Sequence, residues 1–468
     1  MVDPALLDRA RGHAVRFLES LATRPVHRNP TAESMRDQFA SPLPERGEDG
    51  AQVIDALVEA VEPGLVATAG PRYFGFVIGG SLPAALAADW LASAWDQNAG
   101  LFAGSPAGAA CEEVVSGWLL DLLDLPRESS IGFVTGCQMA NFTGLAAGRH
   151  AVLSRAGWDV ERDGLQGAPR VRVIVGGDAH ATIFTSLRML GLGAGNAIVV
   201  EHDGAGRMKT AALERALAEG TGPTIVCAQA GNVNTGAFDP FESIADACER
   251  AAAWLHVDGA FGLWARASSS LKALTRGVER ADSWATDAHK WLNVPYDSGL
   301  AIVRDASAHR GAMTSSAAYY EMAGGRREPH EYVPEASRRA RAFPLYAALR
   351  SLGRSGVEAM VDRCCELARR FADGLARVEG VTILNDVVLN QVLVDVEPPA
   401  EVELDVFVRA VIDRVQRSGE CWLGGTTWRG RAAIRISISN WSTTEGDVER
   451  SLAAISDSVA QARGAGVG

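Results

Sequence analysis

Short apolar segments alternate with amphipathic segments between residues 108 and 330, and this alternation constrains the fold more than any other feature. The apolar segments have the length of buried strands, and the segments between them have helical periodicity. Strands that alternate with helices form a mostly parallel sheet that is covered on both faces. The sequence therefore predicts an α/β domain with a mostly parallel seven-stranded sheet. Its expected strands are 131–135, 171–175, 197–200, 224–228, 254–258, 283–286 and 299–303.

The segments outside this alternation have a different character. The N-terminal region reads as helices that begin at Asp3-Pro4, whereas residues 22–50 are polar and read as an exposed excursion. Residues 70–105 mix glycine, proline and aromatic residues, which suits either a pocket wall or an ordinary loop. Residues 306–345 are loop-like. We therefore predict an N-terminal helical segment at 1–65, a large domain at 66–343 and a smaller C-terminal α+β domain at 344–468.

Composition excludes several classes of partner. The net charge of −12 argues against nucleic acid or a membrane surface, because both usually require a basic face. No apolar run reaches the roughly 18 residues of a membrane span, and charges interrupt the N-terminus where a signal peptide would be apolar. The seven cysteines include no CxxC pair, so we expect no metal site and reduced thiols in a cytoplasmic protein.

Small and polar residues follow five of the predicted strands. In parallel sheets the ligand site lies at the carboxyl ends of the strands, so these residues are expected to meet in one place. They are Thr135-Gly136-Cys137, Gly177-Asp178-Ala179-His180, Gly231-Asn232, Asp258-Gly259-Ala260 and Thr286-Asp287-Ala288-His289-Lys290.

Lys290 is the most informative of these residues, because it lies in an apolar stretch directly before Trp291. The chain has 45 basic residues, and only Lys209, Lys272 and Lys290 are lysines. Arginine stays protonated and cannot act as a free amine, whereas a desolvated lysine can form a Schiff base with an aldehyde cofactor. We favour this chemistry for Lys290. The alternative, a lysine that extends along the surface, is the interpretation we favour for the other two.

Three of the other strand ends have both a binding and a structural interpretation. Gly136-Cys137-Gln138 begins a helix and could bind a phosphate, or it could be an ordinary turn. Asp258 could pair with a protonated ring nitrogen of a cofactor, or it could cap a helix. His180 could stack on a flat cofactor ring and contact a substrate carboxylate, or it could be a structural histidine.

Four further polar residues belong to the same strand ends. His289 could contact a phosphate or orient the site, while Asn232, Asn234 and Asp287 could bond to a phosphate or a ring hydroxyl. Asn and Asp are also common in turns for structural reasons, so that alternative stays open. Taken together, a Schiff-base lysine, a ring-nitrogen acid, a stacking histidine and a phosphate turn describe a site for pyridoxal 5′-phosphate (PLP).

The chain resembles the group II PLP-dependent amino-acid decarboxylases, which include the aromatic-amino-acid and glutamate decarboxylases. Residues 256–262 (HVDGAFG) resemble the His-Val-Asp-Ala-Ala strand end of that family, and residues 287–299 (DAHKWLNVPYDSG) resemble its Asn/Asp-x-His-Lys-Trp block. Asp258 and Lys290 are 32 residues apart, as the family pattern requires. Residues 177–193 and 234–240 resemble two further family blocks, the first of which contains the stacking histidine.

The resemblance implies a fold type I enzyme with PLP as cofactor, and a homodimer whose active site lies at the subunit interface. It implies that an L-amino acid is decarboxylated to the corresponding amine. Lys290 would be the lysine that binds the cofactor, Asp258 the partner of the pyridine nitrogen and His180 the stacking residue, with Ala260 under the ring. Another PLP reaction is an alternative, whether oxidative deamination coupled to decarboxylation, transamination or Cα–Cβ cleavage. The presence of Lys290 and Asp258 argues against a non-catalytic binding protein.

The resemblance also assigns the phosphate side and a proton donor. Cys137 and Gln138 correspond to phosphate-binding positions, and Asp287 corresponds to another cofactor contact. The family more often has small hydroxylic residues in this turn, so we expect the phosphate contacts there to come from the backbone. Tyr319 resembles the loop tyrosine that returns a proton to Cα, and Tyr320 is its alternative.

Overall fold

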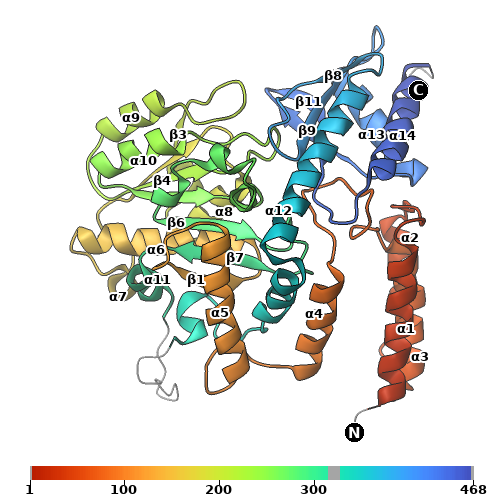
Figure 1. The fold of residues 1–468 in the computed structure, drawn as a ribbon, viewed down its shortest axis with the longest axis horizontal. Coiled ribbons are helices and arrows are strands. Elements are labelled where there is room, and N and C mark those ends of the chain that lie inside the picture. Colours follow the sequence, from red (N-terminus) through yellow and green to blue (C-terminus); the bar gives the residue numbers. More distant parts are fainter. Residues whose placement is uncertain (1–2, 315–326, 465–468) are drawn as a thin grey trace. The chain divides into compact units, whose positions relative to one another are not determined.

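The computed structural model describes residues 3–314 and 327–464 (Figure 1). Contacts between residues divide the chain into two units. The first unit contains Met1–Ile78, Leu367–Leu384 and Val392–Gly468, and the second contains Gly79–Glu366 and Asn385–Gln391. The N-terminal helices thus group with the C-terminal residues, and the domain boundaries at residues 65 and 343 stay a prediction from the sequence.

The second unit is built around a sheet with the strand order β1-β7-β6-β5-β4-β2-β3 within the described residues. β7 is antiparallel to both β1 and β6, whereas the remaining neighbours are parallel. The predicted mostly parallel seven-stranded sheet is therefore confirmed. The strands are β1 (Ser130–Val134), β2 (Arg172–Gly176), β3 (Ile198–Val200), β4 (Thr224–Gln229), β5 (Trp254–Asp258), β6 (Ser283–Asp287) and β7 (Gly299–Val303).

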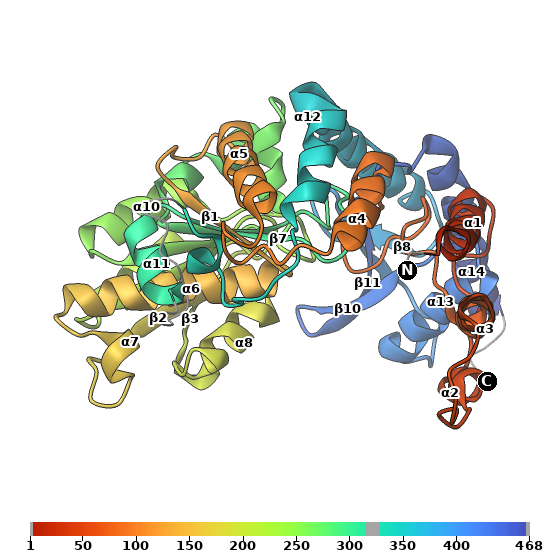
Figure 2. The same ribbon diagram turned by 90° about the horizontal axis from the view of Figure 1, so that it is seen from below.

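Helices cover both faces of this sheet. α6 and α8 lie on one face, and α5 and α10 lie on the opposite face (Figure 2). Apolar residues of β2, β4 and β5 pack against α6 and α8 in one buried cluster. The helices of the unit are α4 (Pro83–Trp95), α5 (Pro106–Leu122), α6 (Cys137–Arg155), α7 (Val160–Asp163), α8 (Ala181–Met189), η2 (Ala194–Asn196), α9 (Thr210–Ala218), α10 (Phe241–Arg250), η3 (Gly262–Ala267), η4 (Lys272–Thr275), η5 (Val278–Arg280), α11 (Ala306–Met313) and η6 (Pro329–Tyr332).

The first unit combines helices with a smaller sheet of strand order β10-β11-β9-β8 in the described chain. The strands are β8 (Val381–Ile383), β9 (Gln391–Val396), β10 (Gly424–Trp428) and β11 (Arg431–Ser437). The helices are α1 (Pro4–Ser20), α2 (Ala32–Phe39), α3 (Gly50–Val61), η1 (Glu62–Gly64), α13 (Leu404–Ser418) and α14 (Glu445–Gly464). α12 (Ala342–Leu375) continues from the second unit into the first and is kinked at Gly353, whose φ is 63°.

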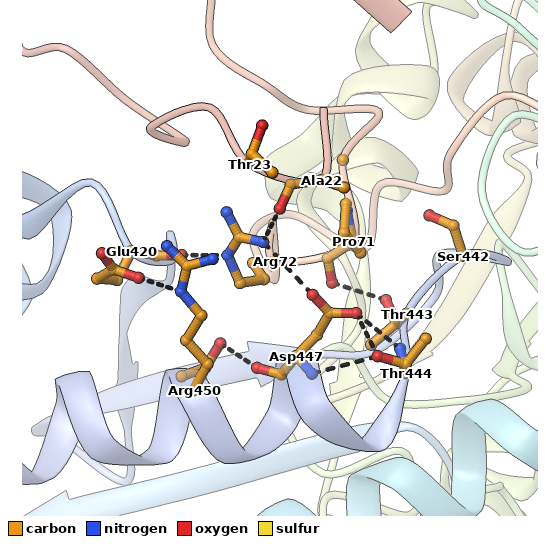
Figure 3. A network of polar contacts seen from close by, with 12 residues as sticks. Ala22, Thr23, Pro71, Arg72, Glu420, Ser442, Thr443, Thr444, Asp447 and Arg450 are labelled. Atoms are coloured by element: carbon orange, nitrogen blue, oxygen red, sulfur yellow. Dashed lines mark hydrogen bonds and ion pairs between the residues drawn. The ribbon is translucent and has the colours of Figure 1, made fainter. Parts of the chain in front are cut away.

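Arg72 joins the N-terminal and C-terminal parts of the first unit (Figure 3). Its side chain is only 1% exposed, and its guanidinium donates to the carbonyl oxygens of Glu420 and Ala22, both at 2.7 Å. Asp447 lies 3.4 Å from the same guanidinium and also accepts a hydrogen bond from Thr444 at the start of α14. The buried charge of Arg72 is thus satisfied by partners that lie far apart in the sequence but within one unit.

Three elements differ from the sequence predictions. α2 lies in the segment predicted as an exposed excursion, where Thr31 and Ser34 form a capping box. α11 starts inside the segment predicted as loop-like, because Asp305 caps its first turn. β10 was not predicted, because it begins with two glycines, a residue that weakens a strand. No described helix is long and apolar enough to cross a membrane.

Candidate active site

The start of α6 lies against the carboxyl ends of β5 and β6. Gly299 at the beginning of β7 is in register with Val134 on one side and Asp287 on the other. A Cβ atom on Gly299 would lie 2.4 Å from Cα of Gly136, so a glycine is required for this close approach. The backbone N–H of Cys137 at the first turn of α6 is thereby brought within 2.5 Å of Oδ1 of Asp287.

Asp287 ends β6 and is paired with a cation. Its side chain is 2% exposed, and its Oδ2 lies 2.9 Å from Nζ of Lys290. Nε2 of His289 lies 3.3 Å from the other oxygen, which also accepts from Cys137. Three donors, one of them an ammonium, therefore compensate this buried carboxylate within the described residues.

Lys290 carries its proton in this arrangement. Burial by itself would lower the pKa of Lys290, but the attraction of Asp287 and of its neighbours outweighs burial and raises the pKa above its usual value. The argument that desolvation frees the amine therefore has to be corrected, because the carboxylate beside Lys290 reverses the effect of burial. The side chain is 21% exposed, so it is not fully sealed from solvent.

His289 is a neutral donor to Asp287. Burial is the main cause that lowers the pKa of His289, which keeps the ring uncharged at neutral pH. Its Nδ1 accepts from the backbone N–H of Ser298 at 3.2 Å, so the ring proton is on Nε2 and faces Asp287. The ring also stacks on Tyr296, with centroids 4.2 Å apart.

Asp258 ends the neighbouring strand β5 and has a different set of partners. Its side chain is buried at 4% exposure, and Oδ1 accepts from Sγ of Cys137 at 3.4 Å and from the backbone N–H of Ala260 at 3.2 Å. Oδ2 accepts from Nδ2 of Asn141 at 3.2 Å. Burial, reinforced by the charges of Asp258 and Asp287, raises the pKa of the Cys137 thiol well above its usual value, so the sulfur is protonated and donates. No ion pair to Asp258 is formed by the part of the chain that the structure describes.

His180 is linked to Asp258 through two side chains. It caps α8, where its Nδ1 accepts from the backbone N–H of Thr182 at 3.3 Å and lies 2.8 Å from the hydroxyl of Thr182. That hydroxyl lies 3.4 Å from Nδ2 of Asn141, which is bonded to Asp258. The structural interpretation of His180 as a cap is thus observed, and its imidazole is exposed.

The remaining predicted site residues lie farther from these contacts. Asn232 accepts from the backbone N–H of Asn234 at 2.9 Å and so acts as a turn residue at the end of β4. Gln138 is exposed, and its amide reaches only Met189 at 3.9 Å within the described chain. The two candidate proton donors, Tyr319 and Tyr320, lie outside the described residues. Lys209 and Lys272 pair with acidic residues on the surface, as expected.

The sequence analysis missed Asn141, Thr182 and His256. Asn141 lies four residues after Cys137 on α6, a spacing that places both on the same helix face. His256 lies two residues before Asp258, so both side chains point to the same face of the sheet. These two periodicities were the signals that could have identified the network behind Asp258.

Residues 32–396 match the family described as the pyridoxal-dependent decarboxylase conserved domain. The chain is 29% identical over 385 residues to the acidic amino acid decarboxylase GADL1 of Homo sapiens, covering 78% of this chain and 73% of that protein. It is 26% identical over 440 residues to an aromatic-L-amino-acid decarboxylase of Bacillus atrophaeus, covering 92% and 89%. The crystal structure of Oryza sativa TDC with PLP and tryptamine has the same fold, with a TM-score of 0.91 at 24% identity and 98% coverage of both chains.

The observed donor set fits PLP. A carboxylate has about four acceptor positions, and at Asp258 described residues fill three of them, which leaves one for the N–H of a pyridinium ring. The side chain of Lys290 is partly exposed, and Nδ2 of Asn232, at the end of β4, is buried without a partner among the described residues. The start of α6 offers the helix N-terminus that a phosphate requires. With the family match over most of its length, the chain belongs to the pyridoxal-dependent decarboxylase family and carries out PLP-dependent amino-acid decarboxylation.

Proposed function

We propose that this enzyme decarboxylates its L-amino acid at the carboxyl ends of β5 and β6, where Lys290 holds PLP and Asp258 pairs with the ring nitrogen. One observation carries this proposal. Cys137 donates its backbone N–H to Asp287 and its thiol to Asp258, yet only Asp287 has a cationic partner among the described residues. A buried carboxylate without a cation is costly, and a protonated ring nitrogen supplies the missing charge.

When bound, PLP supplies an electron sink for the electron pair that is released at the substrate Cα as CO₂ leaves. Asp258 holds the proton on the ring nitrogen, and hydrogen bonds from three neutral donors fix the orientation of its carboxylate. Lys290 binds the cofactor through Nζ. Asp287 holds the ammonium of Lys290 whenever that amine is not bound to the cofactor.

The substrate is oriented and protonated by two further residues in this proposal. His180 stacks on the cofactor ring and contacts the substrate carboxylate, which its exposed imidazole permits. Tyr319, with Tyr320 as the alternative, returns a proton to Cα. Cys137, Gln138 and His289 contribute to the phosphate side, and the backbone at the start of α6 supplies the main phosphate donors.

Borohydride reduction tests the proposal directly. The enzyme is incubated with PLP, reduced and digested, and we expect a pyridoxyl adduct on the peptide that contains Lys290. Lys290→Arg is the control, because it keeps the charge beside Asp287 but has no amine that can react. An adduct on Lys209 or Lys272, or no adduct, would contradict the proposal.

Product analysis tests the reaction. The relatives are named for acidic and for aromatic amino acids, so both classes belong in the substrate panel together with basic ones. We expect one amine and one CO₂ for each substrate consumed. An aldehyde or a keto acid as the main product would favour the alternative PLP reactions instead.

We further propose a cytoplasmic homodimer with the active site at its subunit interface. An open apolar groove between α4, α5 and α12 in the second unit supports a contact between copies of the chain, because it exposes aromatic side chains to water. Its lining includes Trp95, Trp118, Phe343 and Tyr346. Light scattering should give twice the chain mass, and Trp95→Asp should shift the protein toward the monomer. A monomeric wild-type protein would refute the dimer.

A further inference from the structure

A chain of buried hydrogen bonds ends on Asp258. Nε1 of Trp254 lies 2.9 Å from Oγ of Ser283, which lies 2.8 Å from Nδ1 of His256. Nε2 of His256 lies 2.9 Å from Oδ1 of Asn141, whose Nδ2 lies 3.2 Å from Oδ2 of Asp258. All five residues are buried. Polar groups at this depth require satisfied partners, and each of these groups has one.

The two ends of this chain fix the direction of every hydrogen bond. An ionised carboxylate only accepts, so Asn141 must turn its amide N–H toward Asp258 and its oxygen toward His256. His256 must then donate from Nε2 and accept at Nδ1, where Ser283 donates to it. An indole N–H only donates, so the oxygen of Ser283 accepts from Trp254 while its hydroxyl proton stays available for Nδ1 of His256. Burial lowers the pKa of His256 to about 4, in agreement with a neutral ring.

Close packing of α6 on β5 makes the contact with His256 possible. Gly144 lies three residues after Asn141, and a Cβ atom at that position would lie 2.9 Å from the His256 ring. Any larger residue at position 144 would push the helix away from the strand. The amide of Asn141 is therefore held by the backbone position of α6 as well as by its partners.

Asn141 also connects to the candidate stacking histidine. An amide group has two N–H donors, and the hydroxyl of Thr182 lies 3.4 Å from Nδ2 of Asn141. If that hydroxyl accepts from Asn141, its own proton is available to Nδ1 of His180 at 2.8 Å. The backbone N–H of Thr182 donates to the same Nδ1, so the proton of a neutral His180 must be on Nε2.

We propose that Asn141 is a positioning residue whose one amide group orients Asp258 directly and, through the hydroxyl of Thr182, holds the ring of His180 in place. This inference rests on the roles proposed above for Asp258 and His180. In this arrangement Asn141 keeps an N–H against the carboxylate that faces the cofactor ring. The same amide directs the hydroxyl proton of Thr182 toward Nδ1 of His180, where it adds a second donor to the backbone N–H of Thr182.

The tautomers can be measured in the apoenzyme without any activity assay. Long-range ¹H–¹⁵N spectra of histidine-labelled protein should show His256 as a neutral ring with the proton on Nε2, and the uncharged form of His180 with its proton on Nε2. The signals are assigned by their loss in His256→Gln and His180→Gln. A charged His256, or a proton on Nδ1 of either ring, would overturn the proposal.

One matched pair of variants and one single variant test the consequence for turnover. Thr182→Val removes the hydroxyl at nearly constant size but leaves the backbone N–H on Nδ1 of His180, so it should lower kcat about 3- to 10-fold without changing the tautomer, whereas Thr182→Ser should restore kcat. Asn141→Asp replaces the donor by an acceptor and should lower kcat about 10- to 100-fold with little change in KM. Circular dichroism and thermal melting verify the fold. If Asn141→Asp fails to fold, the Thr182 pair and the wild-type tautomers still decide the question.

The outcomes separate this inference from the proposed function. The borohydride adduct on Lys290 should form in the wild type and in each folded variant. If the wild type forms no adduct, the proposed function fails. If it does form one, but Thr182→Val keeps the kcat of the wild type, only the role of Asn141 is refuted.

Discussion

Asp258 and Asp287 end neighbouring strands of one sheet, are both buried, and both accept a hydrogen bond from Cys137, yet they differ in charge compensation. Asp287 lies 2.9 Å from the ammonium of Lys290. Asp258 accepts from a thiol, a backbone N–H and an amide, none of which carries a charge in the described structure. The charge of Asp287 is therefore neutralised by a residue of the chain, whereas the charge of Asp258 has no cationic partner among the described residues. The proposed pairing of Asp258 with the cofactor ring nitrogen rests on that difference.

Replacement of Asp258 by Asn is expected to have the largest effect. Asp258→Asn removes the charge that holds the ring-nitrogen proton, and the loss of one partner of a buried ion pair costs about 3–5 kcal/mol. If that cost falls on the transition state, kcat drops by at least about 100-fold. The apoenzyme should be as stable as the wild type or more stable, because an uncompensated buried charge is gone. Turnover rates and urea unfolding of the apoenzyme measure both effects, and an equally active Asp258→Asn would invalidate the comparison of the two aspartates.

The histidines behind the two carboxylates predict how stability depends on pH. Burial lowers the pKa of His256 to about 4, and it also lowers the pKa of His289. In the unfolded chain each of these histidines binds a proton with a pKa of about 6.5, whereas in the folded chain it stays neutral to a lower pH. The free energy of unfolding therefore decreases as pH falls from about 6.5 toward 4. For His256 this loss amounts to at most about 3 kcal/mol.

Urea unfolding of the apoenzyme at pH 7, 5.5 and 4.5 measures this loss, with His256→Gln as the matched variant. The difference between the two proteins should shrink as pH falls, because only the wild type loses the contribution of His256. Asp239, whose pKa burial raises to about 6, has the opposite pH dependence but is present in both proteins and cancels. A difference that does not change with pH would mean that folding does not lower the pKa of His256.

The sequence predicted the strand ends well because their positions follow from local patterns. β5 and β7 were expected at their observed bounds, and Asp258 and Asp287 were expected at strand ends, where the structure has them. The protonation of Lys290 could not be predicted in this way, since it depends on how the chain turns between Asp287 and Lys290. The two hydrogen bonds of Cys137 and the position of Asn141 depend on how α6 packs on the sheet, which no local pattern specifies.

Replacement of Asp287 tests whether its carboxylate keeps the amine of Lys290 protonated. Burial opposes the charge of Lys290, but the attraction of Asp287 raises the pKa of Lys290 above its usual value. The stability that Lys290 contributes is therefore present below its unfolded pKa of roughly 10.4 and is lost at higher pH. In Asp287→Asn a larger fraction of the amine is free, so the apoenzyme should capture PLP about tenfold faster at pH 8.

Stopped-flow absorbance over pH 6.5–9.5 follows this capture. The rate should rise with pH in both proteins, and the rise should occur at lower pH in Asp287→Asn. Asp258→Asn serves as the control, because Asp258 contributes less to the pKa of Lys290 than Asp287 does. Coincident pH profiles for the wild type and Asp287→Asn would show that the ion pair does not control the amine.

Replacement of Gln138 is expected to have the smallest effect, although Gln138 occupies the same turn as Cys137. Its side chain is exposed and reaches only Met189 within the described residues, so the phosphate depends on the backbone and dipole at the start of α6. Gln138→Ala should change the Kd for PLP by no more than about twofold, as expected for a surface substitution. Equilibrium titration of the apoenzyme with PLP and with pyridoxal, which has no phosphate, measures this. A tenfold loss of affinity for PLP without a loss for pyridoxal would mean that the amide of Gln138 binds the phosphate. The side chains of both Cys137 and Gln138 would then act in the site.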